Sequence, residues 1–379
     1  MRVVAVLALL LGFATPVSAS PGWVAAWGSA MQTPVSSDVS GTSYTVRNIV
    51  RLTVGGSTVR VRLSNVFSSG DLTVGKVSVA PPGTGAALDS TPRRVTFHGR
   101  ESVVVPRGGE VLSDPVALKT VADSSVAVSI WASAAPAVAT YHRSALSSNY
   151  VAPGDHARDV AGTAFTQKVS SWYYLSEVAV TSSVRGSVVA LGDSITDGSG
   201  STGGANRRWT DVLASRTSLG VVNSGISGNQ LLRDGTYGVS GISRTPRDVL
   251  DRAGVRTLIV LEGINDIKAK PDATFEELRD GYKKVISLAH SKHVRVLGAT
   301  ITPMGGYANY TDAREAVRTA VNKWIRESGA FDGVADFDKA VRDPAKPTYL
   351  REEFARTDHL HLTDAGYQAM GQAVDLSLL

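Results

Sequence analysis

Residues 187–194 read SVVALGDS, a short apolar run that ends in a glycine, an aspartate and a serine. Four more runs of this kind follow in the second half of the chain. They are GVVN (220–223), TLIVL (257–261), VRVLGAT (294–300) and GVADF (333–337). Short, continuous apolar runs are typical of strands that are buried on both faces of a parallel sheet. The second half of the chain is therefore predicted to contain such a sheet.

Helical patterns alternate with these runs. Apolar residues recur at helical spacing from Phe275 to Ala289 and again from Ala313 to Ile325. Strands that alternate with amphipathic helices are typical of a doubly wound α/β fold. Sites in such folds gather at the carboxyl ends of the strands. Ser194, directly after the first predicted strand, is therefore expected to face a cleft.

The first half of the chain has a different rhythm. Over residues 46–182, segments of alternating or β-branched residues are separated by clusters of Gly, Pro, Asp and Ser. This pattern predicts an antiparallel sandwich or jelly roll. Within it, the segments IVRLTV and STVRVRL flank Gly55-Gly56. Two glycines between two such segments predict a β-hairpin with its turn at the glycines.

The first residues have the pattern of an export signal. Arg2 is followed by an apolar run, residues 3–13, and then by the small-residue cleavage pattern Val17-Ser18-Ala19. The run is too short to span a bilayer, which needs roughly 20 residues. We therefore predict a signal peptide over 1–19, a secreted mature protein that starts near Ser20, and no stable insertion in a membrane.

Composition supports two domains and excludes several functions. A chain of 379 residues exceeds the usual size of one domain, and we expect an accessory β-rich domain over 20–184 and a second domain over 185–379. The chain has no cysteine, which excludes disulfides, a thiol nucleophile and thiolate metal sites. Its 39 Lys and Arg residues form no run of five or more, so no nucleic-acid partner is expected. The oligomeric state is left open.

A serine hydroxyl becomes an effective nucleophile when a base, normally a histidine held by a carboxylate, takes its proton. The segment DHLH (358–361) offers Asp358 and His361, which would share a face if the segment formed a helical turn. His359 would project elsewhere and is the weaker candidate. The pattern thus predicts Ser194 as nucleophile, His361 as its base and Asp358 as the group that orients the base.

Acyl transfer also needs donors that face the developing oxyanion. Gly228, in SGISGN (224–229), could present its backbone N–H after the second predicted strand. Asn265, in EGIND (262–266), could donate its side-chain amide after the third. Glycine and asparagine are common in turns for conformational reasons alone. Their positions after successive strands of one sheet favour a role at the site.

The segments GDSIT, NSGISGN, EGIND and DHLH occur in the order and approximate spacing of the four signature blocks of the SGNH (GDSL) hydrolase superfamily. The chain resembles this family over about residues 186–375. The resemblance implies a flavodoxin-like α/β/α sandwich and ester hydrolysis without a metal or cofactor. The residues that it implies for the site are the nucleophile Ser194, the base His361 with its partner Asp358, and an oxyanion hole of the Ser194 N–H, Gly228 and Asn265. Leu362 stands where many members have proline, which alters a turn rather than the chemistry.

Other patterns are given structural interpretations. Residues 198–203 match G-x-G-x-x-G, but they begin well after the strand, so a loop at the rim of the cleft is expected rather than a dinucleotide site. Asp193 and Glu262 could be the paired carboxylates of a glycosidase. Hydrogen bonds to turns at the strand ends are the preferred interpretation. Arg207 and Arg208 are expected at a solvated helix start rather than at the mouth of the cleft.

The combined prediction is a secreted serine esterase that removes short acyl groups, such as acetyl, from a polysaccharide. Two alternatives stay open. The first is a lipase or carboxylesterase that acts on lipids or small esters, and the second is a glycan-binding protein without catalytic activity. The β-rich domain could bind substrate, complete one wall of the cleft, or stabilise its neighbour.

Overall fold

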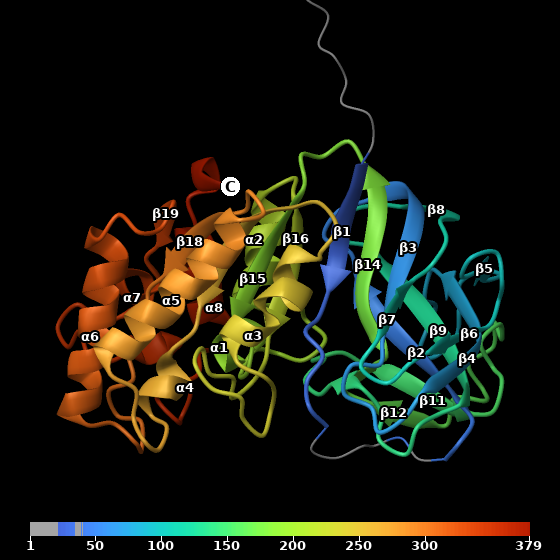
Figure 1. Cartoon of the computed structure of the whole chain (residues 1–379), viewed down its shortest axis with the longest axis horizontal. Coiled ribbons are helices and arrows are strands. Elements are labelled where there is room, and N and C mark those ends of the chain that lie inside the picture. Colours follow the sequence, from blue (N-terminus) through green and yellow to red (C-terminus); the bar gives the residue numbers. More distant parts are fainter. Residues whose placement is uncertain (1–21, 35–38, 40) are drawn as a thin grey trace, which may run out of the picture.

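The computed structural model describes residues 22–34, 39 and 41–379, so the predicted signal peptide lies outside the described residues. Two regions lie side by side in Figure 1. One consists of antiparallel strands and the other of an open sheet flanked by helices. The last antiparallel strand ends at Ser182 and the first parallel strand begins at Ser187. The predicted domain boundary near residue 184 falls in the connection between them.

The second region is built on a five-stranded parallel sheet with the order β16-β15-β17-β18-β19. Its strands are β15 (Ser187–Gly192), β16 (Gly220–Gly225), β17 (Val255–Leu261), β18 (Arg295–Ala299) and β19 (Gly333–Ala335). All five predicted runs form these strands. The order is that of a flavodoxin-like doubly wound fold, in which sites form where the strand order reverses. The predicted fold class is confirmed, and the reversal lies between β15 and β17.

Helices cover both faces of this sheet. They are α1 (Ser194–Asp197), α2 (Trp209–Arg216), α3 (Gly241–Thr245), α4 (Ile264–Ile267), α5 (Phe275–His290), α6 (Asp312–Glu327), α7 (Phe337–Val341) and α8 (Asp364–Ala373), with single turns η1 (Pro246–Leu250), η2 (Glu352–Phe354) and η3 (Leu376–Leu378). Because strand side chains alternate between faces, Val189 and Leu191 of β15 pack toward α5 and α6. Val188 and Ala190 pack toward α2, α7 and α8. The two long predicted helices are α5, which begins at a Thr274 capping box, and α6.

The first region consists of antiparallel sheets around one hydrophobic core. One sheet has the order β1-β14-β3-β7, with β8 also paired to β3, and the other has the order β12-β11-β2-β9-β4-β5, with β6 paired to β4. The strands are β1 (Gly22–Gly28), β2 (Tyr44–Arg51), β3 (Gly56–Ser64), β4 (Leu72–Ala80), β5 (Arg93–Val95), β6 (Val103–Val105), β7 (Glu110–Leu112), β8 (Val116–Thr120), β9 (Ser125–Ala134), β11 (Asn149–Pro153), β12 (Gln167–Val169) and β14 (Leu175–Ser182). A separate short ladder joins β10 (Tyr141–His142) to β13 (Trp172–Tyr173). The predicted antiparallel architecture is confirmed.

The predicted hairpin at Gly55-Gly56 is wrong. β2 pairs with β9 and β11, whereas β3 pairs with β14, β7 and β8. The two glycines do not have the positive φ that a tight hairpin turn requires. They allow close backbone contacts instead, since a Cβ at Gly55 would lie 2.6 Å from the carbonyl oxygen of Thr120. The chain therefore crosses here from one sheet to the other.

β1 lies in the seam between the two regions (Figure 1). It pairs with β14, and its Ala25 N–H donates to the carbonyl of Ala253 in the second region at 2.8 Å. Thr53 Oγ1 accepts from Val221 N of β16 at 2.9 Å. The predicted strands begin only near residue 46. Most of β1 is buried, so it lacks the alternation that marks a half-exposed strand.

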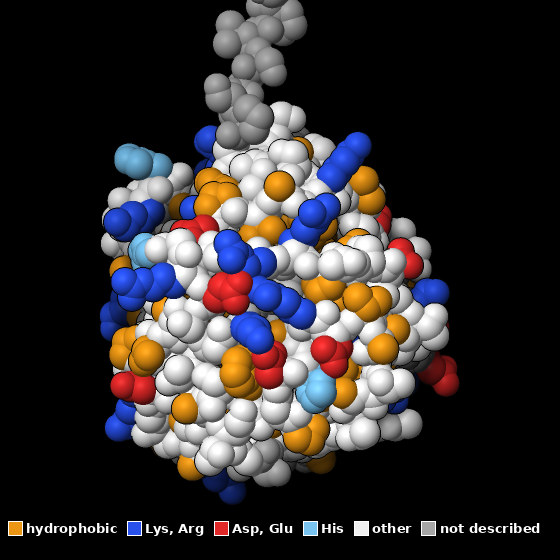
Figure 2. Space-filling model, turned by 90° about the vertical axis from the view of Figure 1, so that its right-hand side faces the viewer, with side chains coloured by type: hydrophobic (Ala, Val, Ile, Leu, Met, Phe, Trp, Pro, Cys, Tyr) orange, Lys and Arg blue, Asp and Glu red, His pale blue; other side chains and the backbone are white. Residues whose placement is uncertain are grey.

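The described part of the chain contains no helix that is long and apolar enough to cross a membrane. On the outer face of the antiparallel region, Lys and Arg side chains are interspersed with Asp and Glu (Figure 2). Pairs such as Arg94 with Glu101 at 3.1 Å belong to this region.

Candidate active site

The structure brings three of the predicted residues into hydrogen-bond contact. Ser194 opens α1 directly after β15, where Asp193 caps the helix. His361 Nε2 lies 2.9 Å from Ser194 Oγ, and His361 Nδ1 lies 2.6 Å from Asp358 Oδ2. Only 6% of Ser194 is exposed, while the His361 side chain is 25% exposed. The hydroxyl is thus shielded from bulk water, and the imidazole beside it is still open to solvent.

A tight turn, rather than the helical turn considered from the sequence, holds Asp358 against His361. Asp358 Oδ1 accepts from the backbone N–H groups of Leu360 at 3.1 Å and His361 at 3.0 Å. His359 takes a φ of 56° between them and lies against Gly306, away from the pair. Partial burial alone would raise the pKa of Asp358, but the hydrogen bonds from the His361 ring and from the two N–H groups outweigh it and lower the pKa. The ionised carboxylate accepts the Nδ1 proton, which leaves Nε2 free to face the serine.

The three predicted oxyanion donors follow three adjacent strands. The N–H groups of Ser194 and Gly228 have no hydrogen-bond partner among the described residues. Gly228 has a φ of 83°, a conformation that favours glycine. Asn265, 8% exposed, donates one amide hydrogen to the carbonyl of Asn229 at 2.8 Å. Its amide carries a second hydrogen, so each of the three groups has a donor available for a ligand.

Arg244 joins the three strand ends that carry these groups. Its side chain is fully buried, and it donates to the carbonyl of Gly192 at 2.8 Å, to the carbonyl of Ser224 at 2.6 Å and to Asn229 Oδ1 at 2.7 Å. It also lies 3.2 Å from Glu262 Oε1. No signal in the sequence marks Arg244, because it sits in a polar segment that resembles an exposed helix.

Asp193 and Glu262 are too deeply buried to be the paired carboxylates of a glycosidase, since each is 1% exposed. Asp193 accepts from the N–H of Ile195 at 2.9 Å, so its predicted role in a turn is confirmed. Burial raises the pKa of Asp193 to about 6. Glu262 bonds Arg244 rather than a turn, and burial raises its pKa well above the ordinary value.

The sequence suggested that Arg208 lies at a solvated helix start, and this prediction is wrong. It is 9% exposed and donates to the carbonyls of Asp197 at 2.8 Å and Ala145 at 2.7 Å. The antiparallel region covers it, which the sequence of the helix could not indicate. Arg207 is exposed and lies 3.6 Å from Asp364.

Two exposed tyrosines lie near the site. Tyr237 is 38% exposed, and its ring packs so closely on Gly228 that a Cβ there would lie 2.6 Å from Cδ2. The antiparallel region holds this tyrosine, because Gln32 donates to its carbonyl at 3.1 Å and the guanidinium of Arg143 lies 5.2 Å from its ring centre. Tyr349, 41% exposed, lies against Gly306 beside His359.

Among the residues that the structure describes, no three His, Cys, Asp or Glu side chains are grouped so as to hold a metal ion.

A doubly wound sheet with Ser194 at its carboxyl edge is the fold of an SGNH-type hydrolase. Residues 190–369 match the model of the GDSL-like Lipase/Acylhydrolase family. The second region of the chain belongs to this family, and the protein is a carboxylic ester hydrolase.

Several solved structures are similar to about half of this chain. One is a putative lipolytic protein of the G-D-S-L family from Desulfitobacterium hafniense, with 24% identity, a TM-score of 0.39 and coverage of 49% of this chain and 96% of that chain. Others are an aryl esterase from M. smegmatis (18% identity, TM-score 0.42, coverage 49% and 95%) and a carbohydrate acetylesterase from Sinorhizobium meliloti (16%, 0.41, 49% and 95%). No match was found among curated proteins.

Proposed function

We propose that the protein hydrolyses esters through an acyl-enzyme formed on Ser194. The observation that carries this proposal is the continuous chain of hydrogen bonds from Ser194 Oγ through His361 to Asp358. His361 Nε2 takes the hydroxyl proton as Oγ attacks the ester carbonyl, and Asp358 stabilises the imidazolium that results. The order of groups is that of a nucleophile, a base and an orienting carboxylate.

The N–H groups of Ser194 and Gly228 and the amide of Asn265 receive the negative charge on the carbonyl oxygen. When the tetrahedral intermediate collapses, the alcohol leaves with the proton held by His361. A water molecule then gives its proton to His361 and attacks the acyl carbon. The second collapse releases the carboxylic acid and restores the serine hydroxyl. No metal or cofactor takes part in this scheme.

Ser194→Ala tests the assignment directly. The folded variant should lose hydrolysis of p-nitrophenyl acetate and labelling by a fluorophosphonate probe. A variant that is folded by circular dichroism and still turns over at the wild-type rate would contradict the assignment. Ser201→Ala is a matched control, because Ser201 is also buried, at 9% exposed against 6% for Ser194, and its hydroxyl donates to the carbonyl of Gly198 rather than facing His361.

The substrate that we favour is a short acyl ester, such as acetate, on a polysaccharide. Two exposed tyrosines near the site, Tyr237 and Tyr349, have flat rings and hydroxyl groups that suit the face of a sugar. A lipase or carboxylesterase acting on lipids is the alternative. Activity should fall as the acyl chain of a p-nitrophenyl ester grows from acetyl to palmitoyl, and acetylated xylan or pectin should release acetate. A preference for long chains would favour the lipid substrate.

Export is the remaining part of the proposal. It is supported by the signal pattern over residues 1–19. Expression of the full chain in a bacterial host should give extracellular protein whose first residue, by mass spectrometry, lies near Ser20. An intact N-terminus on protein that stays in the cytoplasm would contradict export.

A further inference from the structure

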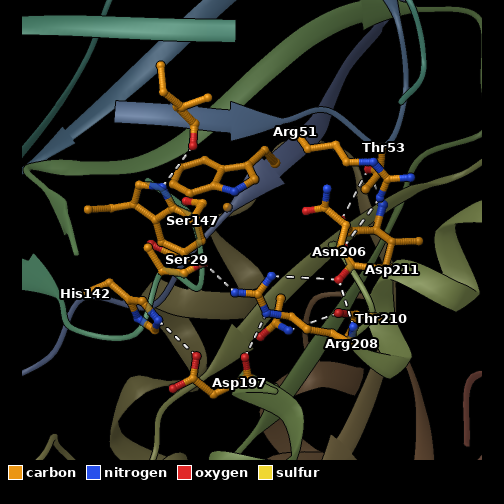
Figure 3. A pocket seen from close by; sticks show the side chains of 17 residues that line it. Ser29, Arg51, Thr53, His142, Ser147, Asp197, Asn206, Arg208, Thr210 and Asp211 are labelled. Atoms are coloured by element: carbon orange, nitrogen blue, oxygen red, sulfur yellow. Dashed lines mark hydrogen bonds and ion pairs between the residues drawn. The ribbon is translucent and has the colours of Figure 1, made fainter. Parts of the chain in front are cut away.

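A buried hydrogen-bonded pair, His142 and Asp197, joins the antiparallel region to the end of the nucleophile helix. His142, in β10, lies with its Nε2 3.1 Å from Asp197 Oδ1, and the two side chains are each 3% exposed. Asp197 is the last residue of α1, the four-residue helix that Ser194 opens. Figure 3 shows the two side chains pointing toward each other across the seam. The adjoining cavity, also lined by Arg208, has a volume of only about 60 Å³, room for a few water molecules. The pair is thus a connection between the regions rather than a binding site for substrate.

The contacts of His142 orient its ring completely. Its Nδ1 lies 2.8 Å from the carbonyl of Ala30, which can only accept. Burial alone would raise the pKa of Asp197, but the contacts with His142, Ser227 and Arg208 outweigh it and lower the pKa. The ionised carboxylate also only accepts, so both bonds form together when each ring nitrogen carries a proton. The contact with His142 thus joins a side chain of one region to a buried carboxylate of the other.

Asp197 also bonds the loop that carries Gly228, the predicted oxyanion donor. Its Oδ2 accepts from Ser227 Oγ at 2.6 Å and from the Ser227 N–H at 3.2 Å. Ser227 directly precedes Gly228. The hydroxyl of Ser199 lies 3.1 Å from Ser227 Oγ and completes the network. One carboxylate therefore fixes the end of the helix that carries Ser194 relative to the loop that carries Gly228.

We propose that His142 is a positioning residue for ester hydrolysis, through which the antiparallel region sets the relative placement of the nucleophile and the oxyanion donor. This inference rests on the proposed roles of Ser194 and Gly228. It gives the antiparallel region a part in catalysis without any contact of His142 with the substrate. Because oxyanion donors act mainly on the transition state, loss of His142 should affect kcat far more than KM.

The first test is His142→Gln, which keeps a polar side chain but cannot make both bonds. A donor displaced by about 1 Å costs up to about a hundredfold in rate, so kcat per active site should fall about tenfold to a hundredfold. KM for p-nitrophenyl acetate should change less than about twofold, since uniform binding is untouched. The inhibition constant of a trifluoromethyl ketone, whose adduct places an oxyanion in the same site, should rise by a factor similar to the loss in kcat. Fluorophosphonate titration counts the active sites in each preparation.

The matched control is His156→Gln. His156 lies in the same antiparallel region and also pairs with an aspartate, Asp159, at 2.7 Å, but this pair is exposed. Its replacement should leave kcat, KM and the inhibition constant unchanged. If His142→Gln gave the same values as this control per titrated site, the inference would be wrong.

Ser227→Ala provides a second route that leaves the pair of His142 and Asp197 in place. It removes the 2.6 Å bond to Asp197 and should lower kcat with little change in KM. If His142 and Ser227 act through the same carboxylate, the loss in the double variant should be smaller than the product of the two separate losses. Independent, multiplicative losses would overturn the inference. If His142→Gln does not fold, Ser227→Ala decides the inference. It should lower kcat and raise the inhibition constant of the trifluoromethyl ketone together, and a variant that changes neither would overturn the inference.

Failure of this inference can be told apart from failure of the proposed function. An active Ser194→Ala variant would remove the proposed function itself. An inactive Ser194→Ala variant beside a His142→Gln variant of wild-type kcat would remove only the role of His142.

Discussion

Replacement of Asp358 by asparagine should reverse the tautomer of His361. Asp358 Oδ1 accepts from two backbone N–H groups, of Leu360 and His361, while Oδ2 faces His361 Nδ1 at 2.6 Å. In Asp358→Asn the amide oxygen should keep the two backbone donors, so the amide NH₂ will face Nδ1. Nδ1 must then accept, and the ring proton moves to Nε2, which faces Ser194. His361 can then no longer accept the proton of Ser194, so its function as a base is lost.

We expect kcat to fall about 10⁴-fold, the effect known for this exchange in serine proteases. At 1.36 kcal/mol for each factor of ten, this is a rise of about 5.4 kcal/mol in the activation free energy. Asp358→Ala should lose less than Asp358→Asn, because alanine does not force the wrong tautomer. The assay is steady-state hydrolysis of p-nitrophenyl acetate per mole of folded protein.

Asp375→Asn is the matched control, since Asp375 Oδ1 also accepts from a backbone N–H two residues on, that of Ser377 at 2.9 Å, but caps a turn outside the site. It should keep full activity. The tautomer argument is refuted if Asp358→Asn retains more activity than Asp358→Ala.

Three further predictions concern the groups around the nucleophile. Arg244→Met should lower the free energy of unfolding by about 3–5 kcal/mol, measured in urea, because the buried carbonyls of Gly192 and Ser224 lose their donor, at a cost of about 1–3 kcal/mol for each unsatisfied group; a loss below about 1 kcal/mol would contradict the described network. Gly228→Ala should lower kcat about tenfold to a hundredfold, since the new Cβ would meet Tyr237 and displace the donor, whereas Gly203→Ala, with open space around it, should be neutral in the same assay. Asp193→Asn should gain stability relative to wild type as the pH rises from 3.8 through about 6. Burial stabilises the protonated form of Asp193, so the wild type loses this contribution to its stability as the pH rises through this window. Thermal unfolding of both proteins across the pH range measures the difference in stability. A difference that does not change with pH would contradict the prediction.

The parts of the structure that the sequence predicts are those set by local pattern. Buried parallel strands need only a continuous apolar run, and all five such runs lie in the sheet. Ser194, Gly228 and Asn265 each follow such a run, so predicting the strands also predicts that these residues share an edge. His361 and Asp358 were identified by spacing, although a tight turn rather than a helical one joins them.

Other features depend on contacts between distant segments, which local pattern cannot reveal. Arg244 looks like a surface residue until three strand ends close around it. His142 and Asp197 are joined only when the two regions pack together. The hairpin prediction was wrong for the same reason. Gly55 and Gly56 allow backbone atoms of later strands to approach closely, rather than forming a turn of their own.

β1 carries a consequence for the order in which the chain can fold. Its hydrogen-bond partner in the sheet is β14, the last strand of the antiparallel region, and its other neighbour is the second region at Ala253. The first strand of the described chain is therefore among the last to find its place. Closure of so long a loop is slow, and until β14 is available β1 has no strand to pair with. A ribosome stalled before β14 should hold an antiparallel region that is still open to protease, whereas release past Ser182 should allow it to close.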